Sequence, residues 1–250
     1  MERVKYIFLL LGFLQAFSVS AQDPVADNML LYQRSAGGWP KAVKEVKVDY
    51  TKTLSPEEKA STLSDINRID ATIDNNATSR EIRYLVTAYK KYNNKAYLAA
   101  AEKGIRYLLK MQQPSGGFPQ YYPDSALYRS QVTFNDNAMI NALNILWDVI
   151  YRTNDFDVVD PALIEPSKTA VAKAIDCILK TQITVNGKLT AWCTQYDKKT
   201  LQPAKARAFE LASIASMESV GIVEFLMKIE KPGPQIRTAI TSAIEWFERS

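Results

Sequence analysis

The sequence contains no histidine among its 250 residues. Histidine is the usual general base near neutral pH and the commonest protein ligand of transition metals, so both chemistries are excluded in their ordinary form. Any reaction on this chain must therefore use aspartate, glutamate, lysine, arginine, tyrosine or a bound metal ion.

Cysteine is nearly as scarce, with Cys177 and Cys193 as the two examples. A closed zinc site needs about four cysteine or histidine ligands, so this chain cannot build one. Cys177 lies in an apolar helical pattern and Cys193 in the segment that follows. The sequence leaves open whether they form a disulfide or stay two buried thiols.

Strong net charge and long apolar runs are also absent. The formal net charge is +4, or +3 without the charged residues of the first 21. This excess is too small to indicate nucleic-acid binding, although it is compatible with a local basic cleft for an acidic ligand. After the N-terminal segment no stretch reaches the roughly 18 apolar residues of a membrane helix. We therefore expect neither a nucleic-acid partner nor a membrane span in the mature chain.

Residues 1–21 have the pattern of a secretory signal peptide. A charged start, MERVK, precedes an apolar run that ends in the small residues VSA. This pattern predicts cleavage after Ala21 and a secreted or periplasmic protein. With 47% hydrophobic residues the chain can bury a full core, and residues 22–250 are predicted to form one domain.

An internal repeat organises this domain. The stretches MLLYQRSAGGWPKAV, LLKMQQPSGGFPQYYP and ILKTQITVNGKLTAWCTQY each place a helical pattern before a glutamine, a glycine break and an aromatic residue. Gly38, Gly117 and Gly187 mark the period, at spacings of 79 and 70 residues. Apolar residues recur at helical spacing between them, and capping boxes begin helices at Ser55 and Thr78. Paired helices at this period predict an all-α fold, an (α/α)3-like toroid of repeated helix pairs.

In such a toroid the loops gather at one end. The segments expected to share this rim are those at Trp39, Asp74, Phe118, Asp136 and Trp192. One more period after Gly187 predicts a glycine-rich loop near position 257, whereas the sequence stops at Ser250 within an amphipathic helical pattern. We therefore expect the C-terminal part of the toroid to be missing from this chain.

Two clusters of short, oxygen-bearing side chains precede helical runs, DNN at 74–76 and NDN at 135–137. Such residues cap helices well, which is the simpler interpretation. Calcium takes about six to eight oxygen ligands and tolerates irregular geometry. Asp74, Asn75 and Asp136 supply two charges and one amide oxygen, a partial calcium site that a polyanionic ligand would complete.

The segment from 191 to 219 combines basic and aromatic side chains, among them Lys205 and Arg207 in KARAFEL. A planar guanidinium suits recognition of carboxylates, and aromatic rings suit the faces of sugars. An ordinary solvated basic loop is the alternative. Lys41 in GGWPK and Arg129 in LYRSQ are open to the same two interpretations.

The loops GGWPK and GGFPQYYP hold aromatic residues on stiff glycine-proline turns. Trp39, with Phe118, Tyr121 and Tyr122, would form a carbohydrate platform or would plug the end of a helix barrel. The sequence does not decide between these two roles.

At this point the chain resembles the family 10 polysaccharide lyases, which are pectate lyases of the helical toroid type. The motifs that carry the resemblance run in order from Asn28 to Val223: NMLLYQRSAGGWPK, TIDNNATSREIRYL, QPSGGFPQYYP, TFNDNAM, AWCTQYD and KARAFELASIASMESVGIV. The resemblance implies a monomer that binds polygalacturonate and performs a calcium-dependent β-elimination, leaving 4,5-unsaturated galacturonate ends. The residues that resemble the calcium ligands are Asp74, Asn75 and Asp136, the arginine base is Arg207, and the candidates for substrate binding are Lys205, Lys41, Arg129 and Trp39.

Physical chemistry alone would not select an arginine as the base, because its pKa lies above about 12. Lys205 is the choice on that ground, since the pKa of a lysine falls readily on burial or beside another cation. The sequence also departs from the family patterns TFNDDAM and WCAQHD at Asn137 and Tyr196.

Two other functions stay open from the sequence. An inverting glycoside hydrolase would use two carboxyl groups roughly 6.5–9.5 Å apart, and the candidates are Asp70, Asp74, Asp136 and Asp197. A toroid that lacks its C-terminal part would bind uronates without turnover.

Overall fold

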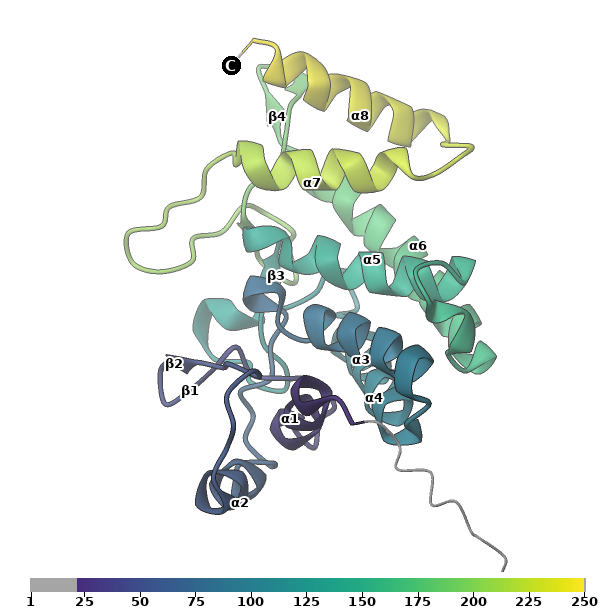
Figure 1. Cartoon of the computed structure of the whole chain (residues 1–250). Coiled ribbons are helices and arrows are strands. Elements are labelled where there is room, and N and C mark those ends of the chain that lie inside the picture. The colour runs from purple at the N-terminus through teal and green to yellow at the C-terminus, as the bar shows by residue number, and fades with distance from the viewer. Residues whose placement is uncertain (1–21, 250) are drawn as a thin grey trace, which may run out of the picture.

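The computed structural model describes residues 22–249, so the predicted signal peptide lies outside the described residues. The described part is mostly helical, as predicted (Figure 1). The helices are α1 (Pro24–Tyr32), α2 (Pro56–Ser64), α3 (Ser79–Tyr92), α4 (Lys95–Met111), α5 (Ala138–Tyr151), α6 (Ile164–Thr181), α7 (Ser216–Met227) and α8 (Pro234–Phe247). Among the described residues no helix is both long and apolar enough to cross a membrane.

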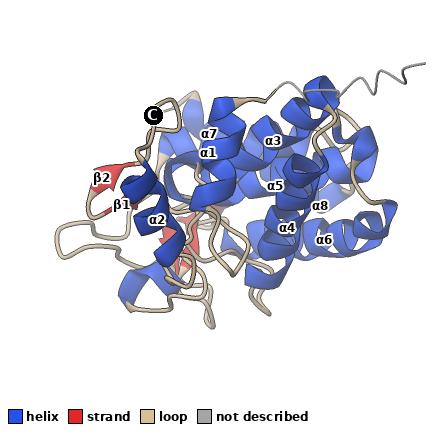
Figure 2. Ribbon diagram, turned by 60° about the horizontal axis from the view of Figure 1, so that its bottom comes forward, coloured by secondary structure: helices blue, strands red, loops and turns tan. Residues whose placement is uncertain are grey.

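Strands and 3-10 turns are short and lie between the helices. The strands pair antiparallel as β1 (Ala42–Val43) with β2 (Val46–Lys47), β3 (Val132–Thr133) with β6 (Gln195–Tyr196), and β4 (Thr184–Val185) with β5 (Lys188–Leu189). The 3-10 turns are η1 (Asp74–Asn76), η2 (Leu127–Ser130), η3 (Asn135–Asn137), η4 (Phe156–Val158) and η5 (Pro161–Leu163). In Figure 2 the short strands β1 and β2 lie to one side of α3, α4, α5 and α6, near α1 and α2.

The helices form two rows of a curved stack. In one row α3, α5 and α7 follow one another, and in the other α1, α4, α6 and α8 do so. The consecutive helices α3 and α4, α5 and α6, and α7 and α8 pack as pairs. The all-α toroid of repeated helix pairs is therefore confirmed, and it places the start of α3, α5 and α7 at the same end of the molecule.

The repeated glutamine has a structural role that explains the repeat. Gln33, Gln112 and Gln182 directly follow α1, α4 and α6. Each side-chain amide donates one hydrogen bond to its own loop and a second to the next helix of the same row. The acceptors are Gly37 O and Ala100 O for Gln33 (2.7 and 2.9 Å), Gly116 O and Ala170 O for Gln112 (2.9 and 2.8 Å), and Thr190 O and Ala239 O for Gln182 (2.8 and 2.9 Å).

The repeated tryptophan closes the rim end of the core. The side chains of Trp39 and Trp192 are fully buried, and their indole N–H groups donate to the carbonyls of Met29 (2.7 Å) and Ile178 (2.8 Å). The expectation that Trp39 binds substrate is therefore wrong, because a ring without exposed surface cannot stack on a sugar. Phe118 is buried in the same way, so these aromatics are plugs.

Close packing at Gly104 fixes Trp39 in this position. A Cβ atom at Gly104 would lie 2.7 Å from Ile82 Cγ1 and 2.8 Å from Trp39 Cζ3. Glycine therefore lets α4 approach both α3 and the indole ring, and the ring fills the space that a larger residue would take.

The two predicted capping boxes have different outcomes. Ser55 forms one, with its hydroxyl accepting from Glu58 N and the Glu58 carboxylate accepting from Ser55 N. Thr78 does not, since its backbone is left-handed (φ 67°) and its hydroxyl makes no cap hydrogen bond. The Thr78 hydroxyl instead accepts from Trp39 N (3.0 Å) and donates to Thr72 O (2.7 Å). Both cysteines are buried free thiols, one of the two expected states.

Candidate functional site

Backbone hydrogen bonds join the rim segments into one layer, as predicted. Segments far apart in the sequence meet here because each leaves or enters a helix at the same end of the stack. The bonds run from Thr72 N to Trp39 O (3.0 Å), Ile73 N to Gln120 O (3.1 Å), Thr133 N to Phe118 O (3.0 Å), and Phe134 N to Thr194 O (2.7 Å).

A polar cavity of about 220 Å³ opens in this layer. We call it the rim cavity. It is lined by Lys41, Asp74, Asn75, Gln120, Tyr128, Asn135, Asp136, Gln195, Ala206, Arg207 and Glu210. The structure thus brings together the predicted residues Lys41, Asp74, Asn75, Asp136 and Arg207.

Asp74 is the buried acid of the rim cavity, with 2% of its surface exposed. Its Oδ2 atom forms an ion pair with Lys41 Nζ, whereas Oδ1 is buried without a hydrogen-bond partner. Burial opposes the charge on Lys41, but the hydrogen bond and the charge of Asp74 outweigh it and raise the Lys41 pKa. Lys41 is therefore a fixed cation, and one carboxylate oxygen of Asp74 remains free for a ligand.

Two left-handed turns bring the other oxygen atoms to the cavity. Asn75 in η1 has φ 50° and Asp136 in η3 has φ 52°, a conformation that asparagine and aspartate tolerate better than most residues. The two turns lie in contact. Both side chains are exposed, and Asn135 Nδ2 donates to Asp136 Oδ2 (2.8 Å). The same backbone shape therefore presents one amide and one carboxylate side by side.

Arg207 reaches the cavity from the long loop between β6 and α7. Its guanidinium pairs with Glu210, and its backbone N–H donates to Glu210 Oε2 (3.1 Å). The hydrogen bond and charge of Glu210 raise the Arg207 pKa, with a smaller contribution from Asp74. The same pair lowers the Glu210 pKa to about 2. Both groups are charged at neutral pH in this arrangement.

The donor set of the rim cavity suits a hard cation. Besides Asp74 Oδ1, the buried amide oxygens of Gln120 and Gln195 have no hydrogen-bond partner. Calcium prefers such mixtures of carboxylate, amide and water oxygens. In the described part of the chain no three His, Cys, Asp or Glu side chains converge as a metal cluster, so the protein would supply at most the carboxylates of Asp74 and Asp136 together with amide oxygens.

Two predicted substrate-binding residues do not line the rim cavity. Arg129 pairs with Asp124 (2.8 Å) and lies over the ring of Tyr121, 4.9 Å from its centroid. Lys205 is exposed on the loop that carries Arg207. Their roles stay predictions.

Six cavity residues were not among the predicted site residues: Gln120, Tyr128, Asn135, Gln195, Ala206 and Glu210. Of these, Glu210 carried a usable signal, because it follows Arg207 by three residues in KARAFEL. Gln195 lies opposite Thr133 in the β3–β6 pair, a pairing across a separation that no local pattern reports.

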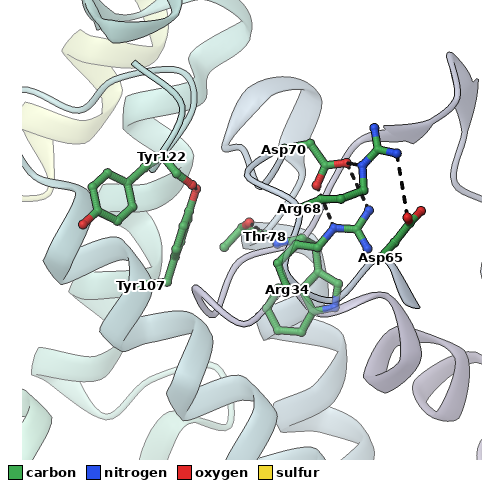
Figure 3. A network of polar contacts seen from close by, with 8 residues as sticks. Arg34, Asp65, Arg68, Asp70, Thr78, Tyr107 and Tyr122 are labelled. Atoms are coloured by element: carbon green, nitrogen blue, oxygen red, sulfur yellow. Dashed lines mark hydrogen bonds and ion pairs between the residues drawn. The ribbon is translucent and has the colours of Figure 1, made fainter. Parts of the chain in front are cut away.

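The other acids considered for a hydrolase are engaged elsewhere. Asp70 binds the fully buried Arg34 (Nε to Oδ1, 2.7 Å) and Arg68 (Nε to Oδ2, 3.1 Å), which form the network in Figure 3. Asp197 accepts from the backbone of Lys199 and Thr200 in its own turn. Neither lines the rim cavity.

Fold and site together define a class, a helical toroid whose loop end holds a charged cavity lined by oxygen atoms. The model of the family described as pectic acid lyase matches residues 33–250. The chain belongs to this family, and its resemblance to the family 10 polysaccharide lyases is confirmed.

Two solved structures are similar to the chain. One is a family 10 polysaccharide lyase from Cellvibrio cellulosa, with 37% sequence identity and a TM-score of 0.79. The other is a mutant of the family 10 lyase from that organism in complex with trigalacturonic acid, with 36% identity and a TM-score of 0.78. Each match covers 90% of this chain and 66% of the other chain. No curated protein sequence matches.

Proposed function

We propose that this protein is an exported pectate lyase that cleaves polygalacturonate by calcium-dependent β-elimination. The observation that carries the proposal is the convergence of Lys41, Asp74, Asp136 and Arg207 on one cavity. Family membership and the trigalacturonic acid bound to the similar lyase support the substrate class. The predicted signal peptide supports export.

The cation-binding residues of the proposed site are Asp74, Asn75 and Asp136. Asp74 Oδ1 lacks a partner, and Asn75 and Asp136 present exposed oxygen atoms on matched turns. Calcium, when bound, supplies positive charge against the uronate carboxylate and makes the proton on the adjacent carbon C5 more acidic. Lys41 adds a fixed positive charge at the wall.

In the proposed reaction Arg207 removes the C5 proton. The electron pair of the C5–H bond forms the C4–C5 double bond, and the C4–O bond breaks with its electron pair going to the leaving sugar oxygen. That oxygen takes a proton from solvent, and the base returns its own proton to solvent, so no water is consumed. Arg207 must be deprotonated to start, which a high working pH favours.

Paired substitutions test these roles. Arg207→Ala is expected to abolish formation of the unsaturated product, measured by its ultraviolet absorbance, and to preserve calcium-dependent binding to polygalacturonate. Asp136→Ala is expected to abolish the calcium dependence. Elimination at the wild-type rate by Arg207→Ala would remove the base assignment. New reducing ends without ultraviolet absorbance would indicate a hydrolase instead.

A further inference from the structure

A second cavity, of about 700 Å³, lies beside the rim cavity at the end of α4. We call it the α4 cavity. Its wall includes Pro119, Tyr121, Tyr122, Ser130, Lys198 and Lys199. None of these residues lines the rim cavity, so the two cavities are separate.

The two cavities share a wall. Pro119 and Tyr121 face the α4 cavity, while Gln120 between them faces the rim cavity. This alternation is that of an extended segment, whose successive side chains point to opposite sides. The wall is therefore one backbone layer thick at this position.

Two further chain segments also contribute at least one residue to the wall of each cavity. Tyr128 lines the rim cavity and Ser130 lines the α4 cavity. On the next segment Gln195 lines the rim cavity and Lys198 the α4 cavity. Lys198 Nζ also donates to Ser130 Oγ (3.3 Å) and joins the two segments. Three chain segments therefore contribute to both cavities, and the two cavities lie side by side.

The charge of the α4 cavity favours an anion. Three lysines line it, Lys110, Lys198 and Lys199. The carboxylate in the same wall, Asp124, is held by Arg129 (2.8 Å). The wall therefore carries a net positive charge.

The remaining surface of the α4 cavity suits a sugar ring. Tyr121 and Tyr122 stand in its wall with the pyrrolidine rings of Pro119 and Pro123, and carbohydrate rings pack well on such flat apolar groups. Gln113 Oε1 and Ser115 Oγ in the same wall are buried without hydrogen-bond partners. They would bind the hydroxyl groups of a sugar, and an unpaired buried polar atom otherwise costs free energy.

We propose that the α4 cavity is an additional subsite, next to the catalytic cavity, that binds a uronic-acid unit of the same polymer. The lysines hold the carboxylate, the tyrosine and proline rings hold the ring face, and Gln113 and Ser115 hold hydroxyl groups. The identity of the polymer rests on the proposed function, whereas binding of an acidic sugar rests on the α4 cavity alone.

The test compares Lys198→Gln/Lys199→Gln with Lys59→Gln/Lys173→Gln. The control pair removes the same charge from exposed lysines on α2 and α6 that line neither cavity. Binding of methyl galacturonide and of the neutral methyl galactoside is followed by NMR titration, with the signals of residues around Tyr122 reporting the α4 cavity. The expected result is that galacturonide perturbs these signals in the wild type and in the control, and that the perturbation is lost in the test variant.

Kinetics with long polygalacturonate give the second readout. The test variant is expected to raise KM by roughly threefold to tenfold, the scale of losing two exposed ion pairs, while the control variant keeps the wild-type KM. An unchanged titration and an unchanged KM in the test variant would overturn the subsite. If the wild type forms no unsaturated product but galacturonide still perturbs the signals around Tyr122, the proposed function fails and the binding site stands.

Discussion

The ion pair with Glu210 favours the protonated, charged form of Arg207. The carboxylate accepts from both the side chain and the backbone of Arg207 and raises the Arg207 pKa. A base must lose its proton before it acts, so this ion pair opposes the role that we propose for Arg207. Substrate binding or high pH must weaken the pair before the reaction begins.

Replacing Glu210 by glutamine tests this reasoning. Without the carboxylate the Arg207 pKa falls toward its ordinary value, so the deprotonated form appears at lower pH. The rising limb of the pH–rate profile is therefore expected to move to lower pH in Glu210→Gln. The profile is measured as kcat/KM for unsaturated product.

The matched control for this shift is Glu224→Gln, which removes an exposed carboxylate from α7 outside the rim cavity. It should leave the profile in place. A Glu210→Gln profile that coincides with that of the control would show that Arg207 is not the titrating base.

Residue chemistry made part of the site predictable. Asp74, Asn75 and Asp136 were accessible because short oxygen-bearing side chains cluster directly before two helical runs, although the same pattern is typical of helix caps. Trp39 was not, because a tryptophan on a glycine-proline turn is equally suited to a surface platform and to a plug. Its burial depends on the space that Gly104 leaves on another helix. The sequence around Trp39 does not predict that contact.

At the scale of helices, the repeated glutamine links neighbouring helix pairs through hydrogen bonds. Each glutamine after α1, α4 and α6 ties its loop to the next helix in the row. The sequence showed the period and the glutamine, but not the partner helix. Ala100, Ala170 and Ala239 offer no side-chain signal, because they accept through backbone carbonyls.

Gln112 provides a test of this link. In Gln112→Ala the carbonyls of Gly116 and Ala170 lose their shared donor, and the free energy of unfolding is expected to fall by about 1–3 kcal/mol. Gln112→Glu should destabilise further near neutral pH, because a carboxylate would face two carbonyl oxygens. Urea denaturation measures both effects.

The control for the loss of a glutamine side chain is Gln202→Ala, on an exposed loop. It is expected to change the free energy of unfolding by less than about 0.5 kcal/mol. A carboxyl group can donate a hydrogen bond once it is protonated, so the extra penalty of Gln112→Glu should shrink at low pH. Equal stability of all three variants would mean that the bridge contributes nothing.

The incorrect capping box at Thr78 shows where local patterns fail. Thr-Ser-Arg-Glu has the composition of a cap, but the Thr78 hydroxyl accepts from Trp39 N of another rim segment and donates to Thr72 O of its own segment. Ser219 does the same for Trp192 N (2.9 Å) in a later repeat. A tertiary contact that recurs in the repeat therefore overrides a local signal, and only the assembled rim reveals it.

At the scale of the whole molecule, the rim cavity belongs to no single repeat. Lys41 lies between α1 and α2, Asp74 precedes α3, Asp136 precedes α5, and Arg207 precedes α7. The stacking of helix pairs therefore sets the separation of the proposed cation-binding oxygens. A cation bound between η1 and η3 would join successive pairs, and its binding energy would stabilise the stack.

Calcium is accordingly expected to raise the thermal stability of this protein. A ligand that binds only the folded state at about 100 times its Kd adds about 2.7 kcal/mol, which corresponds to a rise in Tm of roughly 5–10 °C for a domain of this size. Asp136→Asn should lose most of this shift while keeping the left-handed turn, because asparagine tolerates positive φ. Asp157→Asn, in η4 and outside the rim cavity, should keep it, and so should Arg207→Ala. The Tm of the wild type and of the three variants is measured by scanning calorimetry, once with calcium and once with a chelator. If Asp136→Asn and Asp157→Asn respond to calcium alike, the ion is bound somewhere other than between the two turns.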